Sequence, residues 1–243
     1  MQATPAITRP RRRRERWFYL CMSAAVAITV FAGFAPTYYL RPRFTTAPLM
    51  PLLHLHGLVF TSWVVLFVTQ TTLVAAHRTD IHRRLGIVGG VIAVLMILIG
   101  FSTAVIRAKQ GATPVPDVSP LSFLVVPFGD MFVFAILVGA GFYYRRRSDV
   151  HKRLMMLATI SILAAAIARL PLAIMKAGPP AFFGLTDLFV VACVLYDLIT
   201  LKRIHRTTVI AGLFIVASQP LRLLLGGTHA WLAFAAWLTH WVA

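Results

Sequence analysis

The sequence predicts an all-α protein, a polytopic membrane bundle of seven transmembrane helices followed by a C-terminal interfacial helix. Of its 243 residues, 59% are hydrophobic and only 13% are charged, whereas soluble domains have about 45–50% and about 25%. The mean hydropathy is +0.80. Seven apolar runs are each long enough to cross a hydrocarbon core of about 30 Å. These three observations exclude a soluble or a disordered chain.

The apolar runs follow one another with short polar connections. They are Trp17–Ala35, Leu52–Ala76, Leu85–Ile106, Leu121–Tyr144, Leu154–Met175, Phe182–Leu201 and Thr207–Leu225. Residues 1–16 form a basic tail before the first run, which we expect to stay in place as an uncleaved span. Residues 17–225 are therefore predicted to form the transmembrane domain.

Residues 226–243 follow two glycines and are too short to span a membrane comfortably. Trp231, Phe234, Trp237 and Trp241 recur there at helical spacing. Tryptophan prefers the headgroup region of a bilayer. This pattern predicts an amphipathic helix that lies in the membrane interface.

Lysine and arginine are unevenly distributed between the two sides of the predicted bundle. Seventeen of the 24 basic residues fall in the N-terminal tail and in the loops on its side. Five fall on the other side, namely Arg41, Arg43, Arg107, Lys109 and Lys176. We expect the protein to lie in the cell inner membrane. The positive-inside rule then places its N-terminus in the cytoplasm. The net charge of +17 suits a bilayer of anionic lipid, and no nucleic-acid partner is expected.

A short motif repeats at the cytoplasmic starts of three predicted helices. Residues 80–85 read DIHRRL, residues 149–154 read DVHKRL and residues 203–206 read RIHR. Asp80 and Asp149 suit helix N-termini as caps. The histidines of the motif, His82, His151 and His205, are candidate ligands of haem b or of a transition metal. The alternative is that they are interfacial residues beside the helix caps.

A second polar group lies in the outer half of the predicted bundle. It consists of Asp130, Arg169, Asp187, Gln219 and Arg222, with His54 and His56 as further candidate cofactor ligands at the start of the second run. Charges inside a bilayer are costly, so we expect one connected polar cluster. Pro127, Pro171 and Pro220 lie beside three of these charges and favour a substrate pocket that opens outward. The alternative is two buried ion pairs that fix the bundle.

Two stretches carry a family resemblance. HLHGLVFTSWVVLFVTQTTLVAAHRTDIHRRLG at 54–86 and DVHKRLMMLATISILAAAIARLP at 149–171 resemble an uncharacterised family of small bacterial integral-membrane proteins with a His-Arg-Arg-Leu-Gly motif. That family is similar to domains associated with cytochrome-oxidase assembly and, more distantly, to b561-type cytochromes, where two pairs of membrane-embedded histidines hold two b haems. The fourth and sixth runs here contain no histidine. This departure argues against the two-haem arrangement and leaves one haem, between His82 and His151, as the arrangement compatible with the resemblance.

These patterns support three hypotheses on function. The first is a haem- or metal-linked protein of the bacterial inner membrane, with a role in redox chemistry or in the assembly of a respiratory complex. The second is a transporter that binds a small solute or an ion in the outer polar pocket. The third is a structural partner of other membrane subunits. The sequence has no hydrolase triad, phosphate loop or dinucleotide fingerprint, so it assigns no reaction.

Overall fold

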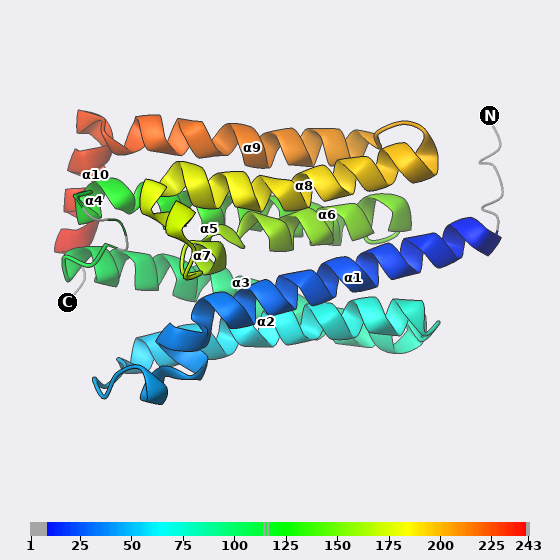
Figure 1. Ribbon diagram of the computed structural model, residues 1–243, viewed down its shortest axis with the longest axis horizontal. Coiled ribbons are helices and arrows are strands. Elements are labelled where there is room, and N and C mark those ends of the chain that lie inside the picture. Colours follow the sequence, from blue (N-terminus) through cyan, green and yellow to red (C-terminus); the bar gives the residue numbers. More distant parts are fainter. Residues whose placement is uncertain (1–8, 114, 116, 242–243) are drawn as a thin grey trace.

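The computed structural model describes residues 9–113, 115 and 117–241, and these residues form helices and no strands. Seven helical segments are long and apolar enough to cross a membrane, which confirms the predicted polytopic all-α bundle. They are Arg13–Tyr39, Pro51–Ala75, Thr79–Lys109, Pro120–Tyr143, Ser148–Ile167, Pro179–Leu201 and Arg206–Gly226. Figure 1 shows the long helices side by side along the long axis of the molecule.

The individual helices are named in chain order. They are α1 (Arg9–Phe34), the π-helical turn η1 (Ala35–Tyr39), the 3₁₀ turn η2 (Arg41–Arg43), α2 (Pro51–Ala75), α3 (Thr79–Lys109), α4 (Pro120–Phe123), α5 (Val125–Tyr143), α6 (Ser148–Ser161), α7 (Ala164–Ile167), the 3₁₀ turn η3 (Ala173–Ala177), α8 (Pro179–Leu201), α9 (Arg206–Gly226) and α10 (His229–His240). Among the described residues, three of the seven spans are therefore built from two consecutive helical elements, α1 with η1, α4 with α5 and α6 with α7.

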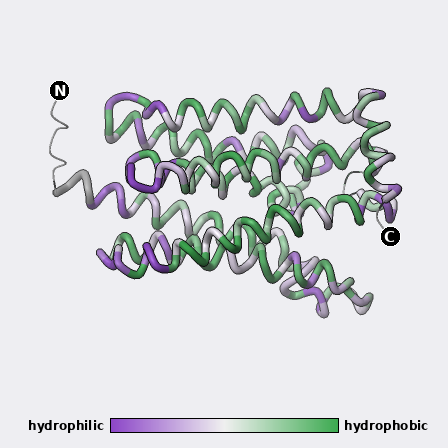
Figure 2. Tube along the Cα trace, turned by 180° about the vertical axis from the view of Figure 1, so that it is seen from behind, coloured by the Kyte–Doolittle hydropathy of each residue, from purple (hydrophilic) through white to green (hydrophobic). Residues whose placement is uncertain are grey.

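The core of the bundle surrounds α6, which packs against α5, α8 and α9. Phe134 of α5 and Leu157 and Ile160 of α6 are fully buried there. Large apolar side chains such as Ile87 and Leu224 are instead exposed on the outside. Figure 2 shows hydrophobic residues along the middle of the bundle and hydrophilic residues gathered towards its ends. This distribution fits a bundle whose sides contact lipid.

The two ends of the bundle differ in charge. We call the end that carries the start of α1 and the connections α2–α3, α5–α6 and α8–α9 the basic end (Figure 1). The opposite end carries η1, η2, η3, α4 and α10. The motif histidines therefore lie at the basic end, and most of the second polar group lies in the other half.

Helix α10 lies across the opposite end rather than along the bundle, and it contacts α3, α4 and α9 (Figure 1). Trp231 is buried, and its Nε1–H donates to the carbonyl oxygen of Leu121 at 2.9 Å. Trp237 and Trp241 are 57% and 72% exposed. One part of the predicted aromatic stripe thus anchors the helix to the bundle, and the other part is free to contact the membrane interface.

The fifth apolar run is interrupted, which differs from the continuous span expected over Leu154–Met175. Helix α6 ends at Ser161 and α7 ends at Ile167. Pro171 follows, and a proline disfavours helical geometry at the residue before it. Arg169 therefore lies in the connection after α7 and not within a helix.

The expected aspartate caps are also absent from the helix starts described here. The N-cap positions of α3 and α6 are Arg78 and Arg147, and neither makes a side-chain capping bond. Asp80 and Asp149 lie two residues after these N-cap residues, in the first turns. A carboxylate in the first turn still interacts favourably with the helix dipole.

Candidate functional site

Two histidines of the repeated motif come together at the basic end. His82 lies in the first turn of α3, and His151 lies in the first turn of α6. The centroids of the two imidazole rings are 6.2 Å apart, and the ring planes are inclined by 78°. The fold thus brings together two residues that are far apart in the sequence.

Each of these two rings keeps a nitrogen for a further interaction. His151 Nδ1–H donates to the carbonyl oxygen of Gly141 at 2.7 Å, so the neutral ring carries its lone pair on Nε2. A backbone carbonyl often fixes a metal-ligating histidine in this way. His82 Nδ1 is buried and has no hydrogen-bond partner among the described residues.

The surroundings of His82 add one more polar atom and some room. Gln70 Nε2 donates to the carbonyl oxygen of His82 at 3.2 Å. Gln70 Oε1 is buried and, within the described part of the chain, unpartnered. Gly86 lies one helical turn after His82, and a Cβ atom there would meet nothing within 4 Å. There is therefore open space beside α3 at Gly86, one turn from His82.

His205, the third motif histidine, has a different role. Its Nδ1 accepts a hydrogen bond from the backbone N–H of Thr207 at 3.1 Å, so it caps α9. Its Nε2 lies 3.3 Å from Asp149 Oδ2. Burial and the nearby charge of Arg153 lower the pKa of His205, although Asp149 acts in the other direction. Across the described residues, no group of three or more His, Cys, Asp or Glu side chains could hold a metal ion.

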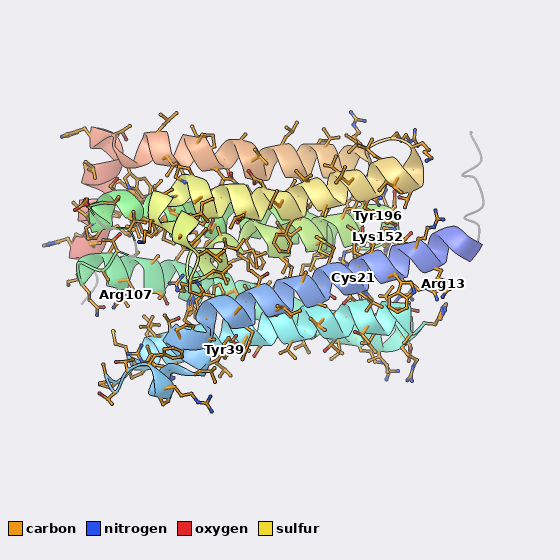
Figure 3. All side chains as sticks on the ribbon, viewed as in Figure 1. Arg13, Cys21, Tyr39, Arg107, Lys152 and Tyr196 are labelled. Carbon is orange, nitrogen blue, oxygen red and sulfur yellow. The ribbon has the colours of Figure 1, made fainter. Side chains whose placement is uncertain are left out.

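A buried ion pair at the basic end was not predicted. Arg153 of α6 and Asp197 of α8 form two hydrogen bonds, at 2.5 and 3.3 Å. Asp197 also accepts from the hydroxyl of Thr208 at 2.6 Å and from the backbone N–H of His205 at 3.1 Å. A small cavity beside the pair is lined by Tyr196 and other residues of α1, α6, α8 and α9; Figure 3 labels Tyr196 at this end.

One member of this pair had a sequence signal. Asp197 is one of two carboxylates inside the sixth run, the other being Asp187, and it lies four residues before the end of the run. Arg153 is the second basic residue of the motif DVHKRL and belongs to the seventeen basic residues that the charge distribution places on the cytoplasmic side. Its helix turns it inward instead, so that only 6% of the residue is exposed.

In the second polar group, Asp130 of α5 and Arg222 of α9 form a buried ion pair at 2.5 Å. Arg222 also donates to Ser218 Oγ at 2.8 Å, and its guanidinium lies 5.6 Å from the ring of Phe183. A Cβ atom at Gly129 would lie 2.2 Å from Arg222 Cδ. Glycine is therefore required next to Asp130 so that the arginine side chain can lie against α5.

The remaining members of the group do not complete a second ion pair. Asp187 of α8 accepts a hydrogen bond from Gln219 Nε2 at 2.7 Å. Arg169 is exposed, its Nη1–H donates to the carbonyl oxygen of Ala165, and its guanidinium lies 4.8 Å from the ring centroid of Phe34. The four charges thus separate into one ion pair, one aspartate–glutamine contact and one arginine apart from both.

The two histidines at the start of α2 point in different directions, as expected for residues two apart on a regular helix. His54 is exposed, with its ring 6.1 Å from the ring of Tyr38. His56 is partly buried and stacks on Phe60 with the ring centroids 4.0 Å apart. His56 Nδ1 is buried and lacks a hydrogen-bond partner among the residues that the structure describes.

Comparisons of the chain with protein-family models, with curated proteins and with solved structures find no match.

Proposed function

We propose that this protein is a redox protein of the bacterial inner membrane that holds one metal centre, most suitably haem b, between His82 and His151. The observation that carries the proposal is the pair of adjacent imidazoles with a ring nitrogen to spare on each. The excess of basic residues at this end supports a cytoplasmic position for the pair.

The separation of the rings suits ligation of one ion from two opposite sides. A bond from a metal ion to a histidine nitrogen is about 2.0–2.1 Å long. Two rings that bind one ion from opposite sides therefore have centroids about 6 Å apart. The observed distance is 6.2 Å.

The number of protein ligands favours haem over a free metal ion. Structural zinc sites use four protein ligands, whereas this pair offers two imidazoles, with the unpartnered amide oxygen of Gln70 close to His82. In haem the macrocycle supplies four nitrogens, so two axial histidines complete the coordination. The open space at Gly86 is compatible with a flat group beside His82. When bound, such a group would supply one-electron transfer.

The contacts of the outer polar group favour a structural role for these residues over a role in binding a transported solute. Arg222 is paired with Asp130 and also donates to Ser218, while its Nε is buried without a partner among the described residues, and Gly129 leaves room for the arginine side chain. A buried pair of this kind fixes the arrangement of α5 and α9. We therefore assign it a structural role.

The test is an absorption spectrum and a metal analysis of the protein purified from cells supplied with haem, iron and copper. We expect a haem spectrum and about one iron per chain. His82→Ala and His151→Ala should each lose the spectrum because each removes a ligand. His229→Ala is the matched control, since His229 is exposed on α10 at the other end of the bundle. A folded preparation without colour and without metal would overturn the proposal.

A further inference from the structure

Asp187 is a carboxylate within a membrane span that has no cationic partner among the described residues. It lies eight residues after Pro179, the first residue of the 23-residue helix α8. At a rise of about 1.5 Å per residue, Asp187 lies roughly 12 Å along the helix and therefore inside the hydrocarbon layer. The other five carboxylates in the described spans each form an ion pair, namely those of Glu15, Asp80, Asp130, Asp149 and Asp197.

The hydrogen bond that Asp187 does make comes from the inside of the bundle. Helices α8 and α9 run side by side (Figure 1), and Gln219 of α9 donates through Nε2 to Asp187 Oδ1 at 2.7 Å. Gln219 is 6% exposed, whereas Asp187 is only partly buried. The amide therefore holds the carboxylate in position but leaves its charge uncompensated, because an amide is neutral.

The side of α8 that carries Asp187 is open. Gly184, Asp187, Leu188 and Val191 recur at helical spacing and lie on one side of the helix, which we call the α8 face. Leu188 and Val191 are 59% and 47% exposed, and a Cβ atom at Gly184 would meet nothing within 4 Å. In membranes, a small residue lets a second helix approach closely, and a polar side chain then bonds across the contact. The α8 face offers both features.

We infer that the α8 face is the docking surface for a transmembrane helix of another membrane protein, one that carries a lysine or an arginine at the depth of Asp187. Charges inside a bilayer are costly and pair with one another, so a basic side chain from a neighbouring helix would neutralise this carboxylate. A symmetric contact with a second copy of this chain would instead bring two Asp187 carboxylates together, and like charges repel. The inference does not depend on the metal centre at the basic end.

The test is photo-cross-linking of the full chain with synthetic transmembrane peptides in lipid vesicles. Each peptide is a helix of leucine and alanine with one photoreactive leucine, and it carries lysine, glutamate or leucine about 12 Å from one end. We expect the lysine peptide to cross-link to the α8 face. The glutamate and leucine peptides should cross-link about tenfold less, because neither supplies a positive charge. Mass spectrometry of the digested product locates the cross-link.

Variants of the protein separate the charge from the packing. Asp187→Asn should reduce cross-linking of the lysine peptide about tenfold, because it removes the charge. This variant should fold, since asparagine keeps a carbonyl oxygen that accepts from Gln219. Gly184→Leu should reduce cross-linking about threefold, because the leucine would occupy the open space on the α8 face. Asp117→Asn is the matched control and should change nothing, since Asp117 is exposed in the loop between α3 and α4.

Four results would overturn the inference. Equal cross-linking of the three peptides would show that the charge on the partner is irrelevant, and equal cross-linking of the lysine peptide to the wild type and Asp187→Asn would show the same for this chain. Unchanged cross-linking in Gly184→Leu would place the contact elsewhere. Self-association of the protein in vesicles without peptide, if lost in Asp187→Asn, would assign the α8 face to a second copy instead.

Discussion

Arg153 is a charged residue that is almost fully removed from solvent, with 6% of its surface exposed. Removing a charge from water costs several kcal/mol, and that cost is offset only when the partner and the hydrogen bonds are well placed. Asp197 supplies two hydrogen bonds to the guanidinium and is itself satisfied by Thr208 and by the backbone of His205. The pair therefore links α6, α8 and the start of α9.

The first prediction concerns this pair. Arg153→Ala should lower the free energy of unfolding by about 3–5 kcal/mol, because it leaves the buried carboxylate of Asp197 without its counter-charge. The double variant Arg153→Met/Asp197→Leu should recover most of that loss, since it removes both charges and keeps apolar volume. Unfolding in detergent, followed by circular dichroism, measures both.

The control for this prediction is Arg146→Ala. Arg146 is exposed in the connection between α5 and α6, and a substitution there should change stability by less than about 0.5 kcal/mol. If Arg153→Ala behaved like Arg146→Ala, the pair would contribute nothing, and its burial would need another explanation.

For individual residues, the sequence predicted the histidines of the candidate site but not the partners of the buried arginines. His82 and His151 stand in a repeated motif at equivalent helix starts, so their proximity could be expected. Arg153 could not be distinguished from a surface arginine, because its partner lies 44 residues further along the chain. The partner of Arg222 could not be chosen from spacing either, since depth in the membrane leaves both Asp130 and Asp187 open.

Helix α9 shows how a single side chain can set the start of an element. His205 occupies the N-cap, a position at which Ser, Thr, Asp and Asn are usual. Its Nδ1 accepts the backbone N–H of Thr207, and this bond requires an unprotonated Nδ1. Asp149, Arg153 and Asp197 surround the ring. Burial and Arg153 outweigh Asp149, so the pKa of His205 is lowered.

The second prediction follows from that lowered pKa. In the unfolded chain a histidine gains its proton near pH 6.5, whereas in the folded protein His205 stays neutral to lower pH. The contribution of His205 to stability should therefore be complete above about pH 6.5 and should decline as the pH falls towards the folded pKa. Unfolding measured from pH 7.5 to pH 5 in the wild type and in His205→Asn tests this.

The variant His205→Asn distinguishes the effect of protonating residue 205 from the effect of losing its N-capping hydrogen bond. Asparagine is a favourable N-cap residue and does not titrate in this range, so the variant should fold and should lose part of the decline towards acid. An identical pH profile in both proteins would show that other groups cause the dependence.

The order and number of the elements followed from hydrophobic run length, because a membrane requires about 20 apolar residues per helix. The break between α6 and α7 could not be predicted from run length, because Ile162–Ile167 is as apolar as the residues around it. Composition does not report such a break. Pro171 pointed to a disruption of this run but not to the residue at which α6 ends.

The molecule as a whole separates two kinds of chemistry at its two ends. The basic end holds the histidine pair and the Arg153–Asp197 pair, and the opposite end holds Arg169 beside Phe34. An odd number of spans puts the start of α1 and the end of α9 on opposite sides of a membrane. The two ends of the bundle therefore face different compartments.

The third prediction fixes which compartment each end faces. The chain has two cysteines, Cys21 and Cys193, so a background without cysteine needs two substitutions to alanine. In that background, Lys176→Cys at the opposite end should react with a membrane-impermeant maleimide added to cells whose outer membrane is permeable. Arg146→Cys at the basic end should react only after the inner membrane is opened. The physical reason is that basic loops are retained on the cytoplasmic side during insertion. If the two residues showed the reverse pattern, the histidine pair would lie on the outer side, where it could not exchange electrons directly with cytoplasmic donors.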